Sequence, residues 1–437
     1  MLKISLIVIT ISVSFTQTTI SGEISGFLSV ENSPYFVVDE LILAQNDSLI
    51  IEAGSQIIFM GNHRIRIDSS TVLLAEGTAE DSIIFTYNQN DYEPIENQFW
   101  GGMRLLHSGE KTIIFRYCII EYMGPIPTGT PYAGVLGVYD SNIIIDHCLI
   151  QKNSGNSMGG ESSGVSITES KGIITNSVFK NNGNDENNFD VVFYGGAINF
   201  WGARPGTVVK NCLIYNNYAG MGGGVSIAFS GDNVIFENTL FAYNYALTFA
   251  GAAYIVFNSY PVFNNCIFNG NTITDPNEYP TFVTFYSHDE ISIGSSILDD
   301  DNCLWKGHLE GWEFVPDENE CGCDCPYYDF INVDPLHVDV ENSDFSLQPA
   351  SPAINAGTGE PDPDGSPPDI GPIYYHLTKG DVNFDDQINV MDIIAGIQFI
   401  LLISEPLNSQ AWTFDTNDDG NLNVLDIIQI VNVILEG

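Results

Sequence analysis

A short pattern recurs through the middle of the chain, and it constrains the fold more than any other feature of the sequence. Each copy reads Asn, His or a similar residue, then a small residue, then two apolar residues, and ends with an Asn five positions after the small residue. The small residues of the clear copies are Cys148, Ser177, Cys212, Thr239 and Cys266, and the steps between them are 29, 35, 27 and 27 residues. Cys118 and Ser296 occupy this position in two weaker copies. Like residues at like positions indicate repeats that stack in register.

A second pattern has the same period. Residues 195–198, 222–225 and 251–254 read Gly-Gly-Ala-Ile, Gly-Gly-Gly-Val and Gly-Ala-Ala-Tyr. Short β-branched segments bounded by Gly, Asn, Asp or Ser lie between the copies, and no long stretch from 30 to 350 has helical periodicity. These features predict a mainly β chain that forms a parallel solenoid. The small residues should stack inward, the Asn residues should form a ladder at a turn, and the Gly-rich pattern should mark a tight corner.

Residues 23–375 resemble a known fold family. The segments 33–35, 76–78 and 100–102 (Ser-Pro-Tyr, Glu-Gly-Thr and Trp-Gly-Gly) resemble the opening of bacterial right-handed parallel β-helix proteins of the pectate-lyase-like superfamily. The Gly-rich and Asn-containing repeats are similar to those of polymorphic outer-membrane β-helix proteins. The segments 351–357, 362–365 and 369–371 resemble the closing part of the same family. The resemblance implies a right-handed parallel β-helix, and it specifies the fold better than the activity.

Two twelve-residue stretches near the C-terminus repeat at an offset of 34 residues. Oxygen-bearing side chains at positions 1, 3, 5, 9 and 12, with a backbone carbonyl at position 7, are the ligands with which a loop wraps Ca²⁺. The candidate metal ligands are Asp381, Asn383, Asp385, Gln387, Asn389 and Asp392 in the first stretch, and Asp415, Asn417, Asp419, Asn421, Asn423 and Asp426 in the second. Each stretch leads into a predicted amphipathic helix, 390–402 and 424–435. Position 8 is apolar in both, which predicts a short β-bridge between the loops.

This part of the chain, 376–437, resembles a type I dockerin. The resemblance implies an α-helical, EF-hand-like module that holds two calcium ions and binds a cohesin-like protein. Two features depart from the family pattern. Asp386 occupies position 6 of the first loop, where Gly usually makes the turn, and apolar pairs at 390–391 and 424–425 replace the frequent hydroxyl or polar pairs. The receptor could therefore be a cohesin-like protein, a different surface receptor, or the β-helix of the chain itself.

Charge and the first residues indicate the compartment. The formal net charge of −43 argues against nucleic acid and against an anionic membrane surface as partners. Residues 1–22 have one Lys, an apolar run and small polar residues, which predicts a secretory signal peptide. No other segment is long and apolar enough to span a bilayer. We therefore expect a secreted protein, extracellular or at the cell surface, with no membrane span in the mature chain.

The eight cysteines form two sets. Cys118, Cys148, Cys212 and Cys266 follow the repeat and should be small inward residues, with a Cys118–Cys148 bridge as an alternative. Cys303, Cys321, Cys323 and Cys325 lie in an irregular insertion. Two disulfides are favoured over zinc there, because export permits disulfides and Cys-x-Cys-x-Cys is not a usual zinc spacing.

Two hypotheses of different classes describe the function. The first is a non-catalytic rod for binding or display, with a calcium-dependent attachment module. The alternative is a polysaccharide lyase or glycoside hydrolase that carries a dockerin, and no catalytic residue can be assigned for it. Residues of one long coil, among them Asp185, Glu186, Asp190, Tyr194, Trp201 and Arg204, could form a cleft wall, although a solvated loop is favoured. Stacking of Trp201, Trp305 and Trp312 on sugar rings is a further hypothesis, against a favoured role in filling gaps between coils.

Overall fold

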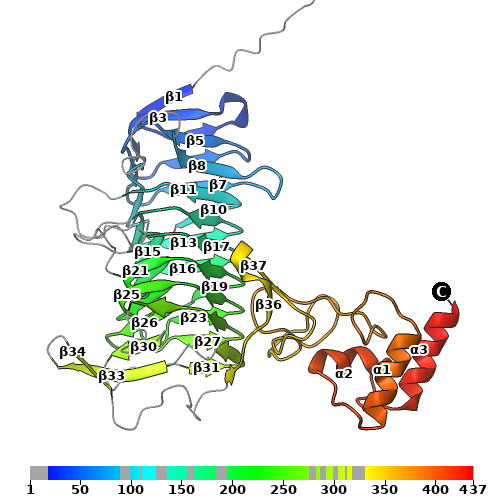
Figure 1. Cartoon of the computed structure of the whole chain (residues 1–437). Helices are drawn as coiled ribbons and strands as arrows, with labels where there is room; N and C mark the ends of the chain where they lie inside the picture. Colours follow the sequence, from blue (N-terminus) through cyan, green and yellow to red (C-terminus); the bar gives the residue numbers. More distant parts are fainter. Residues whose placement is uncertain are drawn as a thin grey trace, which may run out of the picture.

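The computed structural model describes residues 18–88, 99–108, 111–124, 135–154, 162–183, 194–274, 282–285, 292–298, 304–310, 313–316 and 330–436. Most of these residues form short parallel strands that wind into a long rod, and a small helical domain lies to one side of it (Figure 1). The predicted fold class, a mainly β solenoid followed by a small α-helical domain, is confirmed.

Each complete coil contributes one strand to each of three faces, which follow one another along the chain in the order A, B, C. Face A contains β6 (Ile65–Ile67), β9 (Met103–Leu106), β12 (Leu136–Tyr139), β15 (Val165–Thr168), β18 (Ile198–Trp201), β22 (Val225–Ala228), β26 (Ala253–Val256), β30 (Phe282–Phe285) and β33 (Leu304–Glu310). Face B contains β2 (Gly26–Leu28), β4 (Ser48–Ile51), β7 (Val72–Glu76), β10 (Thr112–Arg116), β13 (Asn142–Asp146), β16 (Lys171–Thr175), β19 (Thr207–Lys210), β23 (Val234–Glu237), β27 (Val262–Asn264) and β31 (Ser292–Gly294). Face C contains β5 (Gln56–Phe59), β8 (Ile83–Tyr87), β11 (Cys118–Glu121), β14 (Leu149–Gln151), β17 (Val178–Lys180), β20 (Leu213–Tyr215), β24 (Leu240–Ala242), β28 (Ile267–Asn269), β32 (Ser296–Leu298) and β35 (Phe330–Asn332).

The remaining strands begin the rod or connect its coils. β1 (Thr18–Glu23) pairs in parallel with β3 (Tyr35–Leu43), whose two halves start faces C and A. The strands β21 (Tyr218–Met221), β25 (Tyr245–Phe249) and β29 (Thr272–Ile273) form a small parallel sheet where the chain returns to face A. β34 (Glu313–Pro316) pairs antiparallel with β33, and η1 spans Val30–Asn32. β1 overlaps the predicted signal peptide, 1–22, whose removal stays a prediction.

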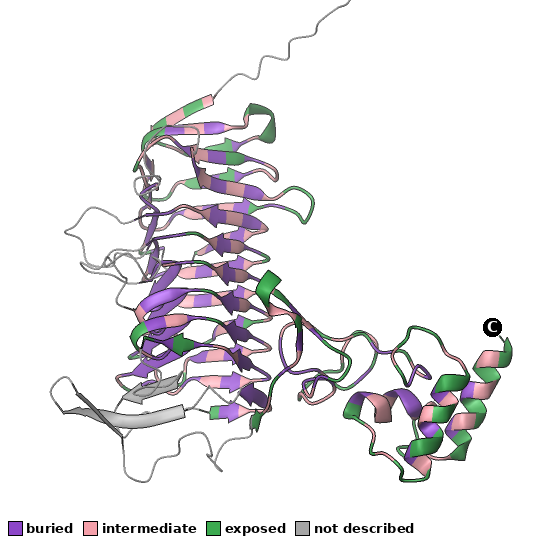
Figure 2. Cartoon of the chain, viewed as in Figure 1, coloured by how far each residue is buried: buried purple, intermediate pink, exposed green. Residues whose placement is uncertain are grey.

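Strand register places like residues on one another inside the rod. Phe236 lies on Phe263 and Phe241 lies on Phe268, with ring centroids 4.7 and 4.9 Å apart and nearly parallel planes. All four side chains are fully buried. Buried residues alternate along the strands of face B, whereas nearly every residue of the middle face A strands is buried, so the core is a column that runs through the coils (Figure 2).

The predicted stack of small residues is confirmed at the corner between faces B and C. Cys118, Cys148, Ser177, Cys212, Thr239, Cys266 and Ser296 are all buried at the start of face C. The backbone N–H of Cys148 donates to Ser177 Oγ at 3.0 Å, and that of Cys266 donates to Ser296 Oγ at 3.1 Å. The residue before each member has a positive φ between 43° and 53°, which turns the chain sharply from face B to face C.

The predicted Asn ladder is also confirmed, inside the rod at the end of face C. Its members are Asn153, Asn182, Asn217, Asn244 and Asn271, each at most 1% exposed. Each Nδ2 except that of Asn271 donates to the Oδ1 of the next member at 2.8 to 3.0 Å. Each Oδ1 except the first also accepts the backbone N–H of the member before it. The left-handed conformation falls on the residue before each Asn, such as Asn216 with a φ of 53°, and leaves the ladder residue free to point inward.

The segment 333–377, here called the closing segment, packs on the outside of face C. It contains β36 (His337–Asp339), the 3-10 helix η3 (Val340–Asn342) and β37 (Asp344–Leu347). Phe345, Ala353 and Ile370 share a buried apolar cluster with Ile267 and Ile297 of the rod. The closing segment therefore covers an outward apolar stripe of face C that the repeat leaves exposed.

The helical domain contains α1 (Val390–Ile400), α2 (Asn408–Phe414) and α3 (Val424–Glu436). α1 and α3 agree with the predicted helices, whereas α2 was not predicted. The core of the helical domain contains Val382, Phe399, Phe414 and Ile430. The glycine Gly396 lets α1 approach α2, because a Cβ there would lie 2.1 Å from the Phe414 ring.

No β-bridge joins the two position-8 residues of the calcium loops in the described structure, so that prediction is wrong. Both side chains pack against the helical core instead.

Candidate calcium-binding and docking site

Two loops of the same design precede α1 and α3. Loop 1 spans 381–392 and loop 2 spans 415–426. All twelve predicted ligand residues lie in these loops, and equivalent residues make equivalent hydrogen bonds. The repeat in the sequence is therefore a repeat of backbone geometry.

The last position of each loop is a fully buried carboxylate, Asp392 or Asp426. Asp392 accepts the backbone N–H groups of Val382 and Asn389, both at 2.8 Å. In loop 2, Asp426 accepts those of Thr416 at 3.1 Å and Asn423 at 2.9 Å. The carboxylate thus joins the start of its loop to the first turn of its helix. Asn389 caps α1 in return, because its Oδ1 accepts the Met391 N–H at 2.8 Å.

The first position of each loop organises the turn. Asp381 accepts the N–H groups of Asp385 at 3.2 Å and Asp386 at 3.0 Å. In loop 2, Asp415 accepts those of Asp419 at 3.1 Å and Gly420 at 3.0 Å. Asp386 has a φ of 62° and Gly420 a φ of 74°, so Asp386 adopts the left-handed turn that glycine adopts without strain.

The middle positions supply further oxygen atoms from short turns. Asn383 Oδ1 accepts the Asp385 N–H at 3.1 Å, and Asp385 Oδ1 accepts the Gln387 N–H at 3.0 Å. Loop 2 repeats both bonds, from Asp419 to Asn417 at 2.9 Å and from Asn421 to Asp419 at 2.8 Å. These side chains place carboxylate and amide oxygens along each loop, and such oxygens are the donors that calcium prefers.

Carboxylate crowding gives loop 1 a reason to bind a cation. Burial raises the pKa of Asp381, and the nearby carboxylates of Asp392 and Asp385 raise that pKa further. Within the described residues, no three acidic, His or Cys side chains converge into a complete metal shell. The loops therefore fit calcium by their all-oxygen donor set and shared backbone geometry, and closing the shell requires the side chains to turn inward.

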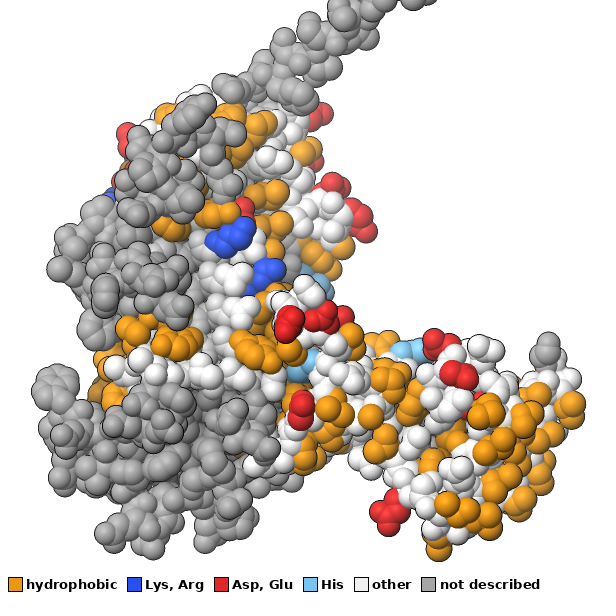
Figure 3. Space-filling model, in the orientation of Figure 1, with side chains coloured by type: hydrophobic (Ala, Val, Ile, Leu, Met, Phe, Trp, Pro, Cys, Tyr) orange, Lys and Arg blue, Asp and Glu red, His pale blue; other side chains and the backbone are white. Residues whose placement is uncertain are grey.

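Exposed apolar side chains extend along α1 and α3. We call this set the apolar helix surface, and its members are Val390, Met391, Ile394, Ile397, Leu401, Val424, Leu425, Ile428 and Leu435. Their exposed fractions run from 39% for Ile397 to 79% for Leu435. Spacings of three, four or seven residues keep each row on one side of its helix. Hydrophobic side chains cover much of the visible face of the helical domain (Figure 3). Such a patch on a small domain indicates a protein-binding surface.

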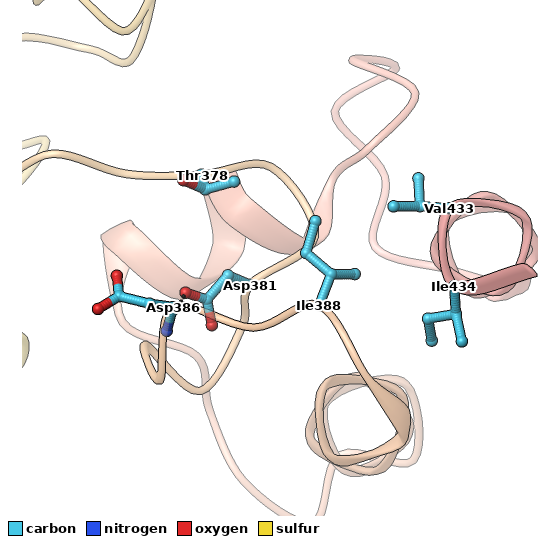
Figure 4. Close-up of a pocket in the computed structure, with 6 residues that line it drawn as sticks. All are labelled: Thr378, Asp381, Asp386, Ile388, Val433 and Ile434. Atoms are coloured by element: carbon cyan, nitrogen blue, oxygen red, sulfur yellow. Dashed lines mark hydrogen bonds between the residues drawn. The ribbon is translucent and has the colours of Figure 1, made fainter. Parts of the chain in front are cut away.

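A pocket of about 380 Å³ lies beside loop 1 (Figure 4). Asp381 and Asp386 line one side, while Ile388, Val433 and Ile434 line the other. Loop 2 makes a different contact: Lys379 Nζ donates to Asp418 Oδ1 at 2.7 Å and to the Asp415 carbonyl at 2.7 Å. The two loops are therefore alike in backbone geometry but not in surroundings.

Comparison with known proteins agrees with this architecture. A right handed beta helix region matches residues 105–296, and a dockerin type I domain matches residues 379–435. No curated protein and no solved structure matches the chain. The chain thus joins a right-handed parallel β-helix to a type I dockerin domain. Dockerin type I domains bind calcium and bind cohesins, and this domain indicates an extracellular or cell-surface protein.

The other predicted features have different outcomes. Cys303, Cys321, Cys323 and Cys325, the acidic residues Asp185, Glu186 and Asp190, and the side chains of Trp305 and Trp312 lie outside the described residues. Trp201 is 36% exposed, so its favoured role as a gap filler is not what the structure has. No helix in the described part of the chain is long and apolar enough to cross a membrane.

The four described cysteines carry free thiols, so no bridge joins Cys118 and Cys148. Burial raises the pKa of the Cys118 thiol well above its usual value, and it raises the pKa of Cys212 and Cys266 to about 12. These thiols stay protonated at neutral pH and act as small core residues.

Sequence reasoning missed one polar cluster on the rod. Asp140 pairs with Arg204 and with His107, whose Nδ1 lies 3.0 Å from Asp140 Oδ2. Hydrogen bonds from His107 and Arg204 lower the pKa of Asp140, so this carboxylate stays ionised. No local motif signals this cluster, because its members come from different coils and Arg204 lies 64 residues from Asp140.

Proposed function

We propose that this protein is a secreted, non-catalytic rod that is held at a surface by its calcium-loaded dockerin domain. The observation that carries the proposal is the apolar helix surface, which is built on the two helices that the calcium loops lead into. Calcium would fix both loops and therefore the start of each helix. The receptor would be a cohesin-like protein with a complementary apolar face, because Val390, Met391, Val424 and Leu425 offer it no hydroxyl groups.

The number of ions can be measured directly. We propose two calcium ions per chain, held by Asp381, Asn383, Asp385, Asn389 and Asp392 with the Gln387 carbonyl, and by Asp415, Asn417, Asp419, Asn423 and Asp426 with the Asn421 carbonyl. Titration calorimetry on the full chain should give a stoichiometry of two. D392N and D426N should each remove one ion, and a stoichiometry of zero in the wild-type protein would contradict the proposal.

Attachment can be tested with immobilised type I cohesin modules. The full chain should bind at least one module in calcium and release it in chelator. The double variant I394D/I428D should lose binding by at least tenfold while still binding two calcium ions. V338D is the matched control, since Val338 is 51% exposed on the rod side of the molecule and should not contact the receptor. Full binding by I394D/I428D would show that the apolar helix surface is not the docking site.

The enzymatic alternative makes a different prediction. A polysaccharide lyase or glycoside hydrolase would generate new reducing ends, or unsaturated uronates, from an acidic and neutral polysaccharide panel in calcium. Such activity in the full chain would replace the non-catalytic proposal.

A further inference from the structure

One corner of the rod, between faces A and B, carries a line of aligned residues. Its members are His107, Asp140, Glu169, Gly202, Phe229 and Phe257, and each has a positive φ between 45° and 64°. The backbone also joins them coil by coil: the Glu169 N–H donates to the Trp201 carbonyl at 2.8 Å, and the Phe229 N–H donates to the Phe257 carbonyl at 3.0 Å. Their side chains therefore leave the rod along one edge.

Gly202 is the member of this line without a side chain, which leaves a notch one coil wide. Its neighbours Glu169 and Phe229 lie two coils apart, on the order of 10 Å. A Cβ added at Gly202 would meet Glu169 Cγ at 3.6 Å and otherwise nothing closer than 4.0 Å. The line therefore has a gap at Gly202 that is bordered by Phe229 on one side and, in van der Waals contact, by the Glu169 side chain on the other.

Aromatic rings form one side of the notch. Trp201 is 36% exposed, and its ring centroid lies 4.9 Å from that of Phe229 at an interplanar angle of 57°. Phe229 is 49% exposed and stacks on Phe257 at 4.8 Å. Stacking on Phe257 holds the Phe229 ring in place, so these exposed rings form a fixed platform.

Ionic groups form the other side. Arg204 follows Gly202 by two residues, and its backbone N–H donates to the Ser170 carbonyl at 2.9 Å. The Arg204 guanidinium reaches past the coil of Glu169 and pairs with Asp140. His107 pairs with the same Asp140 carboxylate. Arg204 is therefore fixed next to the coil of Glu169, and its side chain remains 42% exposed.

We propose that the Gly202 notch binds one sugar residue of a neutral polysaccharide. The apolar face of the sugar ring would stack on Trp201 and touch the tilted Phe229 ring, and its hydroxyl groups would bond to Glu169 and Arg204. A polyanionic glycan is disfavoured, because the chain carries a net charge of −43 and would repel it. This inference deepens the proposed function, since it names what the rod binds.

Affinity electrophoresis of the full chain in xyloglucan, mixed-linkage β-glucan and galactomannan tests the notch, with polygalacturonate as the anionic comparison. We expect retardation by at least one neutral glycan and none by polygalacturonate. W201A removes the platform, and G202N fills the notch with a residue that tolerates a positive φ. Each variant should weaken binding at least tenfold. F27A is the matched control, since Phe27 is 58% exposed in β2 at the N-terminal end of the rod, and it should bind like the wild type.

Several results would overturn the inference. These are no retardation in any neutral glycan, retardation by polygalacturonate alone, or wild-type binding by both W201A and G202N. If W201A fails to fold, as judged by circular dichroism, G202N alone decides. Chelator should leave glycan binding unchanged, because the notch lies on the rod. Loss of glycan binding in chelator would place the site in the dockerin domain. A negative result with the cohesin modules would contradict the proposed attachment but would not affect the test of the notch.

Discussion

Asp386 is the residue at which the two calcium loops differ most in backbone cost. It adopts a left-handed conformation in loop 1, where loop 2 has Gly420. Left-handed geometry is unfavourable for a residue with a Cβ, although Asp tolerates it better than most.

We predict that D386G raises the stability of the dockerin domain by about 0.5–1 kcal/mol, because glycine relieves the backbone strain of the turn. The reciprocal variant G420D should lower it by a similar amount. Thermal melting at saturating calcium compares the two variants with the wild type. Equal melting temperatures for all three proteins would show that the left-handed turn carries no strain.

The buried carboxyl group of Asp369, in the closing segment, predicts that the free energy of unfolding depends on pH. Burial raises its pKa to about 7, although it accepts the N–H groups of Tyr375 and Asn355. The folded chain therefore binds more protons than the unfolded chain between the ordinary Asp pKa and 7. The contribution of Asp369 to the free energy of unfolding should fall as pH rises from about 4 to about 7. Urea unfolding at several pH values should give a flatter profile for D369N than for the wild type, even where D369N is less stable overall.

At the scale of elements, the Asn ladder gives the strongest single-site prediction. Asn217 donates to Asn244 Oδ1 and to the Phe179 carbonyl, and it accepts from Asn182. Asn217→Ala would leave the Asn182 amide and the Phe179 carbonyl buried with a bond missing. We expect a loss of about 2–4 kcal/mol in urea unfolding.

Asn211 provides the matched control for this prediction. It bonds to Asn176 at 3.1 Å in an exposed row at the outside corner. N211G keeps the positive φ accessible, and it should cost less than about 1 kcal/mol because water replaces the lost bond. Equal losses for N211G and Asn217→Ala would mean that burial does not set the value of the ladder.

Elements repeated in the sequence could be predicted, and unrepeated ones could not. The small-residue stack and the Asn ladder depend on identity at a fixed phase, and the calcium ligands depend on a fixed spacing. α2 has seven residues and no apolar period that marks it. The Gly202 notch could not be predicted from sequence either, because the residues along its corner share a positive φ and not a residue type. Helices α1 and α3 were both predicted to be amphipathic, but the sequence does not show that apolar side chains such as Ile394 and Ile428 are left exposed.

On the scale of the whole molecule, the rod and the dockerin domain should unfold separately. The rod buries a continuous core, whereas the dockerin domain has a small one and two clusters of like charge. We predict that chelator unfolds the chain from about residue 379 onward and leaves the β-rich circular dichroism signal largely intact. D415A and D426A should each mimic the loss of the second ion. A dockerin domain that resists protease equally in calcium and in chelator would contradict this prediction.

The two parts also touch, which sets the direction of their coupling. Phe384 of loop 1 lies 6.1 Å from Tyr375, and Trp412 packs against the cluster that the closing segment shares with the rod. Loop 2 has Asp418 at the position of Phe384. Removal of calcium from loop 1 should therefore loosen the closing segment more than removal from loop 2.

The path of the closing segment has a mechanical consequence. Beyond these apolar contacts, the first backbone hydrogen bond to the rod that a pull on the anchored dockerin meets is at Gly371, whose N–H donates to the Asn265 carbonyl at 2.9 Å. The pull then meets Thr358, which exchanges two hydrogen bonds with the Asn265 side chain at 2.7 and 3.0 Å. Tension in flowing fluid thus enters the rod from its flank at the coil of Asn265, and the strands at the end of the solenoid are spared. A protein tethered this way resists being unwound from its last coil.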